Sequence, residues 1–121
     1  MKINVSEASG PTLDFMAARA KGLETYICDG VVCLKGQPLD CNSHYWLPTL
    51  NWDQGGPIIE CEIHTLIERD GIWTAECFWP KYPHPSRFCY SISGPTPLIA
   101  AMRTYVASRL GPCVEVPSEL W

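Results

Sequence analysis

Two Asp-Gly pairs, each placed between runs of β-forming residues, constrain the fold of this chain more than any other sequence feature. Asp29-Gly30 lies in the segment 24–35, and Asp70-Gly71 lies in the segment 58–79. Because both central positions of a two-residue hairpin turn need a positive φ, Asp-Gly is the strongest short hairpin signal. The sequence therefore predicts two antiparallel hairpins whose strands are joined locally.

Two partly apolar segments begin after the same tetrapeptide and predict two helices. Ser-Gly-Pro-Thr occupies residues 9–12 and again residues 93–96, followed by helix-forming residues 13–21 and 97–110. Each threonine is the expected N-cap, because its side-chain oxygen can accept a hydrogen bond from a free backbone N–H, and a glycine is expected to end each helix. The expected helix boundaries are Thr12 and Thr96 at the N-termini and Gly22 and Gly111 at the C-termini.

The order of the predicted elements indicates an α+β fold. Residues 2–5, 88–92 and 113–116 are further candidate strands, whereas the Pro- and Gly-rich segment 36–57 is predicted to be irregular. Because it is too long for a simple connection, this segment is expected to have a function of its own or to contain a short helix. The resulting order is β-α-β-β-loop-β-β-β-α-β. We therefore expect a single domain of 121 residues in which two helices pack on an antiparallel sheet.

The charge and hydropathy of the chain exclude several classes of protein. The net charge is -4 and Lys and Arg form no cluster, so nucleic-acid binding, which needs a basic surface, is not expected. The apolar runs are too short to span a bilayer, and Met1–Ala8 lacks the apolar core of a secretory signal, so a cytoplasmic protein is expected. Most of the seven cysteines are expected to be reduced and buried as small apolar side chains.

A turn-rich segment, Asn51–Pro57, carries the first candidate ligand-binding site. Trp52 offers a stacking plane, Asp53 and Gln54 offer polar groups, and Gly55-Gly56 lets the backbone approach a ligand closely. This combination suits a flat polar ligand such as a nucleobase. It suits equally a rigid corner in which Trp52 fills the core and Asp53 caps a turn, and the sequence leaves both interpretations open.

Thr96 and Arg103 form the second candidate site. Arg103 follows Thr96 by seven residues, about two helical turns, so both lie on one side of the second helix. A helix N-terminus, a hydroxyl and a guanidinium together can bind a phosphate or a carboxylate. Arg19 has the same spacing from Thr12 in the first helix. The simpler interpretation, that each Pro-Thr pair only caps a helix, stays open.

Two Cys/His pairs, Cys41-x-x-His44 and Cys61-x-x-His64, contain the residue types that bind zinc. Residues 61 and 64 lie on a predicted strand, where positions three apart point to opposite faces, so no metal site is expected. No segment has the spacing of a known catalytic motif, and His84 is expected to be a solvated loop residue. We therefore favour a non-catalytic protein, assign no catalytic residue, and expect no cofactor.

Three separated segments resemble the NinX family of lambdoid phages and prophages. They are Met1–Gly10, Asp53–Glu60 and Gly94–Arg103, so the resemblance extends along the chain from end to end. It implies a phage-encoded protein that works in the cytoplasm of the bacterial host, outside the virion. It assigns no activity and no catalytic residue.

These observations lead to two functional hypotheses. The first is a non-catalytic binder of a small polar or nucleotide-like ligand, such as a host defence signal, with the site residues Trp52, Asp53, Gln54, Gly55, Gly56, Thr96 and Arg103. Such pockets are often built between subunits, so a homo-oligomer is expected. The alternative is a protein–protein inhibitor of a host factor that binds through the aromatic loops 45–52 and 78–90. Exposed side chains at Trp46, Trp52 and Trp79 would favour a binding surface.

Overall fold

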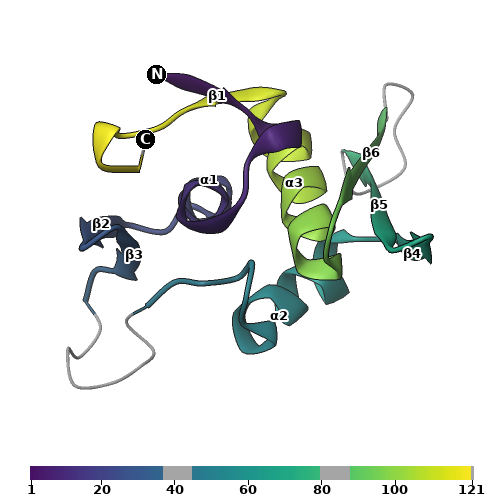
Figure 1. Ribbon diagram of the computed structural model, residues 1–121, viewed down its shortest axis with the longest axis horizontal. Coiled ribbons are helices and arrows are strands. Elements are labelled where there is room, and N and C mark those ends of the chain that lie inside the picture. Colours follow the sequence, from purple (N-terminus) through teal and green to yellow (C-terminus); the bar gives the residue numbers. More distant parts are fainter. Residues whose placement is uncertain (37–44, 80–87, 121) are drawn as a thin grey trace.

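The structure of the protein, a computed structural model, describes residues 1–36, 45–79 and 88–120, except for the side chains of residues 78, 79, 88 and 89. In this part of the chain three α-helices alternate with seven strands (Figure 1). The helices are α1 (Gly10–Lys21), α2 (Trp52–Glu62) and α3 (Pro97–Leu110). The strands are β1 (Lys2–Asn4), β2 (Thr25–Cys28), β3 (Val31–Leu34), β4 (Thr65–Arg69), β5 (Ile72–Trp79), β6 (Phe88–Gly94) and β7 (Cys113–Glu115). The predicted α+β class is confirmed.

All strand pairing in the described part is antiparallel. Strands β4, β5 and β6 form a three-stranded sheet in that order, while β2 pairs with β3 and β1 pairs with β7. The two Asp-Gly hairpins are confirmed, with φ values of 51° and 76° at Asp29 and Gly30 and of 54° and 81° at Asp70 and Gly71. The single predicted sheet is therefore divided into three, of which only β4-β5-β6 has more than two strands.

Helix α3 occupies the centre of the molecule. It packs against β5 and β6 on one side and against α1 and α2 on others, as Figure 1 shows. Met102, Thr104 and Val106 are fully buried in it. The hydroxyl of Thr104 donates to the carbonyl oxygens of Ala100 (2.9 Å) and Ala75 (3.1 Å), so this polar side chain is satisfied within the core. Within the described part of the chain, no helix is both long and apolar enough to cross a membrane.

The two ends of the described chain lie together through the β1-β7 pair. Ile3 is opposite Val114, and the N-terminal amino group lies 2.8 Å from Oε1 of Glu115. Val114 and Val116 are buried, so the C-terminal strand also contributes apolar side chains to the core. Residues 113–116 were predicted to form a strand, and residues 113–115 pair with the N-terminal strand β1.

Helix α2 begins inside the segment 36–57, where a short helix was one alternative, and it corrects the sequence interpretation of residues 51–68. The loop prediction for Asn51–Pro57 and the strand prediction from Ile58 are wrong, because Trp52–Glu62 is helical and only Thr65–Arg69 is a strand. Asn51 caps this helix by accepting from the backbone N–H of Asp53 at 3.0 Å. Helix-weakening residues at positions 55–57 are tolerated because α2 packs on α3.

The two identical tetrapeptides begin their helices differently. At the second, Thr96 is the N-cap as predicted: its Oγ1 accepts from the backbone N–H of Ile99 at 3.1 Å. At the first, the prediction of Thr12 as N-cap is wrong, because α1 begins at Gly10 and Ser9 occupies the cap position. The Thr12 hydroxyl instead donates to the carbonyl of Leu120 at 3.1 Å, a tertiary contact that no local pattern contains.

Candidate functional site

The predicted site residues of the turn-rich segment lie on the first turns of α2. Trp52 is 53% exposed, so it does not fill the core, and its ring lies near Gly56, where an added Cβ would be 3.8 Å from Cε3 of the ring. Asp53 is also exposed, in the first turn of the helix. Trp52, Asp53 and Gly56 are therefore available at the surface, on a helix rather than in a loop.

Gln54 and Gly55 have structural roles. The side chain of Gln54 accepts from the backbone N–H of Leu47 and donates to the carbonyl of Tyr45, each at 2.7 Å, and so fastens the segment 45–47 to α2. Gly55 is buried against neighbouring atoms: an added Cβ would lie 2.5 Å from the carbonyl oxygen of Pro48 and 2.6 Å from Cδ2 of Leu98. The close approach expected of this glycine is thus made to the protein itself.

Arg103 and Thr96 also bind the protein's own backbone. Arg103 donates from Nε to the carbonyl of Ala8 at 2.8 Å and from one terminal nitrogen to the carbonyl of Ser93 at 2.9 Å. Thr96 caps α3, as described above. The predicted site residues of α2 contact the start of α3 where Gly55 lies against Leu98, whereas Arg103 binds the carbonyls of Ala8 and Ser93.

An apolar groove lies where the N-terminal end of α1 meets β3 and the segment that leads into α2. Its volume is about 400 Å³, a size that suits a small ligand. Tyr45 and Leu50 form an exposed rim, with 39% and 75% of their surfaces accessible. The lining residues are Gly10, Pro11, Asp14, Val31, Tyr45, Leu47 and Leu50.

Asp14 is the one carboxylic acid among the groove residues, and it is only 1% exposed. Its Oδ1 accepts from the backbone N–H of Thr49 at 3.0 Å, and its backbone carbonyl accepts from the indole N–H of Trp46 at 2.9 Å. Burial raises the pKa of Asp14 to about 6, although the hydrogen bonding from Thr49 offsets part of that rise. Trp46, itself 5% exposed, is therefore a core residue that helps to position this carboxylate.

The second carboxylate oxygen of Asp14 is unsatisfied. Oδ2 is buried and has no hydrogen-bond partner of good geometry among the residues that the structure describes. The hydroxyl oxygen of Thr49 is also without such a partner, although the Thr49 side chain lies close enough to the carboxylate to lower its pKa. Burying a carboxylate oxygen without a partner costs free energy, since water no longer solvates it. A carboxylate in this state at the edge of an apolar groove is suited to receive a hydrogen-bond donor from a ligand.

Sequence reasoning missed Asp14, although a signal was present. Asp14 is the only acidic residue of α1, and its helical neighbours at positions −3, +3 and +4 are Pro11, Ala17 and Ala18. An acidic residue whose neighbours on the helix face are apolar is one that packing will bury. The groove itself had no sequence signal, because its walls come from three separated segments.

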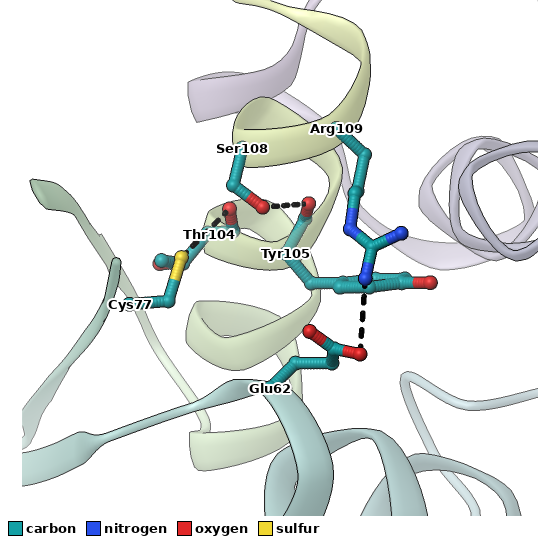
Figure 2. A network of polar contacts seen from close by, with 6 residues as sticks. All are labelled: Glu62, Cys77, Thr104, Tyr105, Ser108 and Arg109. Atoms are coloured by element: carbon teal, nitrogen blue, oxygen red, sulfur yellow. Dashed lines mark hydrogen bonds and ion pairs between the residues drawn. The ribbon is translucent and has the colours of Figure 1, made fainter. Parts of the chain in front are cut away.

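A second polar network joins α2, α3 and β5 (Figure 2). Arg109 pairs with Glu62 at 3.0 Å, and its guanidinium lies 5.4 Å from the centre of the Tyr105 ring. The Ser108 hydroxyl donates to the carbonyl of Tyr105 at 2.7 Å, and the Cys77 thiol donates to the carbonyl of Thr104 at 3.9 Å. The Arg109–Glu62 pair joins the end of α2 to the end of α3, and the Cys77 contact joins β5 to α3. We assign these contacts a structural role.

The predicted Cys/His pairs do not form a described metal site. Cys61 lies on α2, and His64 follows the end of that helix, so their placement on one strand was wrong. Among the described residues, no group of three or more His, Cys, Asp or Glu side chains could hold a metal ion. Cys41, His44 and His84 lie outside the described residues, as does most of the aromatic loop 78–90, including the side chain of Trp79.

The cysteines only partly follow the prediction of burial. Cys33 and Cys77 are buried, whereas Cys28, Cys61 and Cys113 are exposed, and all five are free thiols. Burial raises the pKa of the Cys33 thiol, with a smaller contribution from Cys28 nearby. None of these cysteines lines the groove.

Comparison with known proteins connects the chain to one family. The family model described as Bacteriophage P22, NinX matches residues 4–109. A comparison with curated proteins found no match. The matched region includes α1, α2 and α3 as far as Arg109, and it contains every residue that lines the groove, from Gly10 to Leu50.

Proposed function

This chain belongs to the bacteriophage P22 NinX family and is a phage accessory protein, and we propose that it works by non-catalytic binding of a small ligand in the host cytoplasm. The ligand occupies the groove between the start of α1, β3 and the segment 45–50. In this proposal the protein withdraws a small molecule from the host, for example a defence signal, and leaves that molecule chemically unchanged.

The observation that carries the proposal is the buried carboxylate of Asp14 beside the apolar groove. The groove offers apolar contact area, and Asp14 offers one hydrogen-bond acceptor whose second oxygen has no partner in the described structure. Small-molecule sites characteristically combine an apolar lining with a few convergent polar groups. The groove has both features.

The sequence predicted a polar or nucleotide-like ligand, and the groove limits how such a ligand would bind. A nucleobase could enter the groove and direct an N–H toward Asp14, with Trp52 close to the rim formed by Leu50. Its phosphate would remain outside, because a second negative charge beside a buried carboxylate is repelled. Thr96 and Arg103 are poorly placed to hold that phosphate, since the cap and the two carbonyls already engage their polar atoms.

Equilibrium dialysis of the protein against a small-molecule extract of host cells tests this proposal. Mass spectrometry identifies the compounds that accumulate on the protein side. Val31→Trp fills the groove and is expected to abolish the accumulation, whereas Ser91→Trp, a matched change at an exposed position of β6, is expected to keep it. If the same compounds accumulate on both variants, the groove is not the binding site. A nucleotide among the retained compounds would support the nucleotide-like ligand.

The second candidate function is inhibition of a host protein, and the exposed apolar rim favours it. Leu50, Trp52 and Tyr45 are 75%, 53% and 39% exposed, and they lie within eight residues of the chain. Exposed aromatic and aliphatic side chains that lie together are typical of protein-binding surfaces. Leu50→Ser and Trp52→Ser would then each weaken capture of a specific host protein, while Ile72→Ser, which removes an equally exposed residue from the β4-β5 hairpin, would not. Homo-oligomer formation stays a prediction, to be measured by light scattering.

A further inference from the structure

The charge of Asp14 restricts the class of ligand that the groove can bind more than the shape of the groove does. A carboxylate with a pKa of about 6 is mainly ionised at neutral pH, so the buried group carries a negative charge. The Thr49 N–H satisfies Oδ1, and the indole N–H of Trp46 is used by the backbone carbonyl of the same residue. Among the described residues, no cationic side chain forms a hydrogen bond or an ion pair with Oδ2.

The remaining walls of the groove offer no compensating charge. Apart from Asp14, its lining consists of glycine, proline, valine, leucine and tyrosine. A ligand that enters the groove therefore exchanges water for apolar contacts along most of its length and meets one acidic residue, Asp14. The net charge of the whole chain, -4, also favours the approach of a cation over that of an anion.

We infer that the groove takes a small ligand with an apolar body and one protonated nitrogen, such as an arylalkylamine, whose N–H donates to the free carboxylate oxygen of Asp14. This inference rests on the proposed function, because it assumes that the groove is the binding site. A cationic donor both completes the hydrogen bonding of the carboxylate and neutralises its charge, whereas a neutral donor only completes the hydrogen bonding. An anionic ligand with the same body is rejected.

Three probes with the same ring and different end groups test the inference: 2-phenylethylamine, 2-phenylethanol and phenylacetate. Each is titrated into the unmodified, isotope-labelled protein at pH 7.5 and followed by NMR. The Thr49 amide and the Trp46 indole N–H are the reporters, since both donate to Asp14. The amine is expected to bind about tenfold more tightly than the alcohol, and phenylacetate is expected to leave both signals unchanged.

The variant Asp14→Asn removes the charge and keeps an acceptor for the Thr49 N–H. In this variant the amine and the alcohol are expected to bind equally well, so that the ratio of their affinities falls to about one. Asp70→Asn is the matched control: it removes an exposed carboxylate at a hairpin position with positive φ, where Asn is also tolerated, and it should leave the preference at about tenfold.

Each outcome decides between the two proposals. If the amine and the alcohol bind equally and both move the reporters, the cationic ligand is wrong and the groove remains the binding site. If none of the three probes moves the reporters, the inference is overturned and the proposed function loses its site. An amine preference that persists in Asp14→Asn would place the cation elsewhere and also overturn the inference. If Asp14→Asn does not fold, the relative affinities of the three probes for the unmodified protein still decide whether the groove prefers a cation.

Discussion

At the residue scale, Asp14 is expected to make the protein less stable as the pH rises through the mildly acidic range. Its pKa is about 6 in the folded protein and 3.8 without the protein environment, so the folded state binds the proton more tightly. The resulting stabilisation is complete below pH 3.8 and is lost as the pH rises through about 6. A rise of about two pKa units corresponds to about 3 kcal/mol.

Urea unfolding of the wild type and of Asp14→Asn at pH 4 and pH 7 measures this effect. Other groups also titrate over this range, so the quantity to compare is the difference in unfolding free energy between the two proteins at each pH. That difference should move in favour of the variant by about 2.4 kcal/mol between the two pH values, because part of the unfolded-state carboxyl is already ionised at pH 4. A difference that does not change with pH would mean that Asp14 titrates normally.

Arg103 is expected to contribute to stability, because it joins three parts of the chain. Its two hydrogen bonds connect α3 with the carbonyls of Ala8 and Ser93. Arg103→Ala should lower the free energy of unfolding by about 1.5–3 kcal/mol, since hydrogen bonds made by a charged group are among the stronger ones. Arg103→Lys should recover only part of this loss, because lysine cannot reach both carbonyls with a planar fork.

Arg19→Ala is the control for Arg103→Ala. Arg19 has the same spacing from its Ser-Gly-Pro-Thr sequence but is exposed near the end of α1. Its removal should change stability by less than about 0.5 kcal/mol. Chemical denaturation of both variants provides the comparison. Similar losses of stability in both would contradict the stabilising role assigned to the two hydrogen bonds of Arg103.

At the element scale, α2 offers a test in which two adjacent glycines should respond in opposite ways. Gly55→Ala places a methyl group 2.5 Å from the Pro48 carbonyl and 2.6 Å from Leu98, and should cost about 1–3 kcal/mol despite the better helix propensity of alanine. Gly56→Ala meets only the Trp52 ring, at 3.8 Å, and should stabilise the protein by up to about 1 kcal/mol. Thermal unfolding distinguishes them, and a loss of stability at Gly56 as large as that at Gly55 would contradict the packing described for α2.

The same helix explains why residues 51–62 were interpreted incorrectly from sequence. Gly-Gly-Pro is a strong turn signal, and Pro57 lacks the N–H that would bond to the carbonyl of Asp53 in a helix. Helix α2 nevertheless forms, with Asn51 as its cap, Gln54 fastening the preceding segment and Gly55 packed against α3. These tertiary contacts outweigh weak local propensity.

At the scale of the whole molecule, the pairing of β1 with β7 makes the C-terminal strand necessary for the fold. Val114 and Val116 are buried, and residues 113–115 pair with residues 2–4. A chain ending at Pro112 should lose cooperative unfolding or several kcal/mol of stability, because it exposes the first strand and removes two core side chains. Circular dichroism during urea unfolding measures this loss.

Glu115→Gln serves as the control in full-length protein. It breaks the ion pair with the N-terminal amino group, in which both partners are 59% exposed, and so should have little effect on stability. A truncated chain that unfolds as cooperatively as this variant would mean that β7 is dispensable.

The sequence by itself determined the features that depend on residues close together in the chain. Both Asp-Gly hairpins, the Thr96 cap and the glycines that end α1 and α3 were predicted correctly, because a turn with positive φ or a free helix terminus is satisfied by its immediate neighbours. The α+β class followed from the order of these elements.

Only the tertiary structure decided which polar side chains form hydrogen bonds within the protein and which do not. From the sequence, three polar side chains were expected to cap a helix or to bind a ligand. Each instead forms a hydrogen bond with the backbone of a distant segment or another element: Thr12, Arg103 and Gln54. The sequence assigned no role to Asp14. In the structure it accepts hydrogen bonds from Trp46 and Thr49, which lie more than thirty residues away in the chain. Burial and hydrogen bonding at these positions depend on packing between distant segments, which short sequence patterns do not contain.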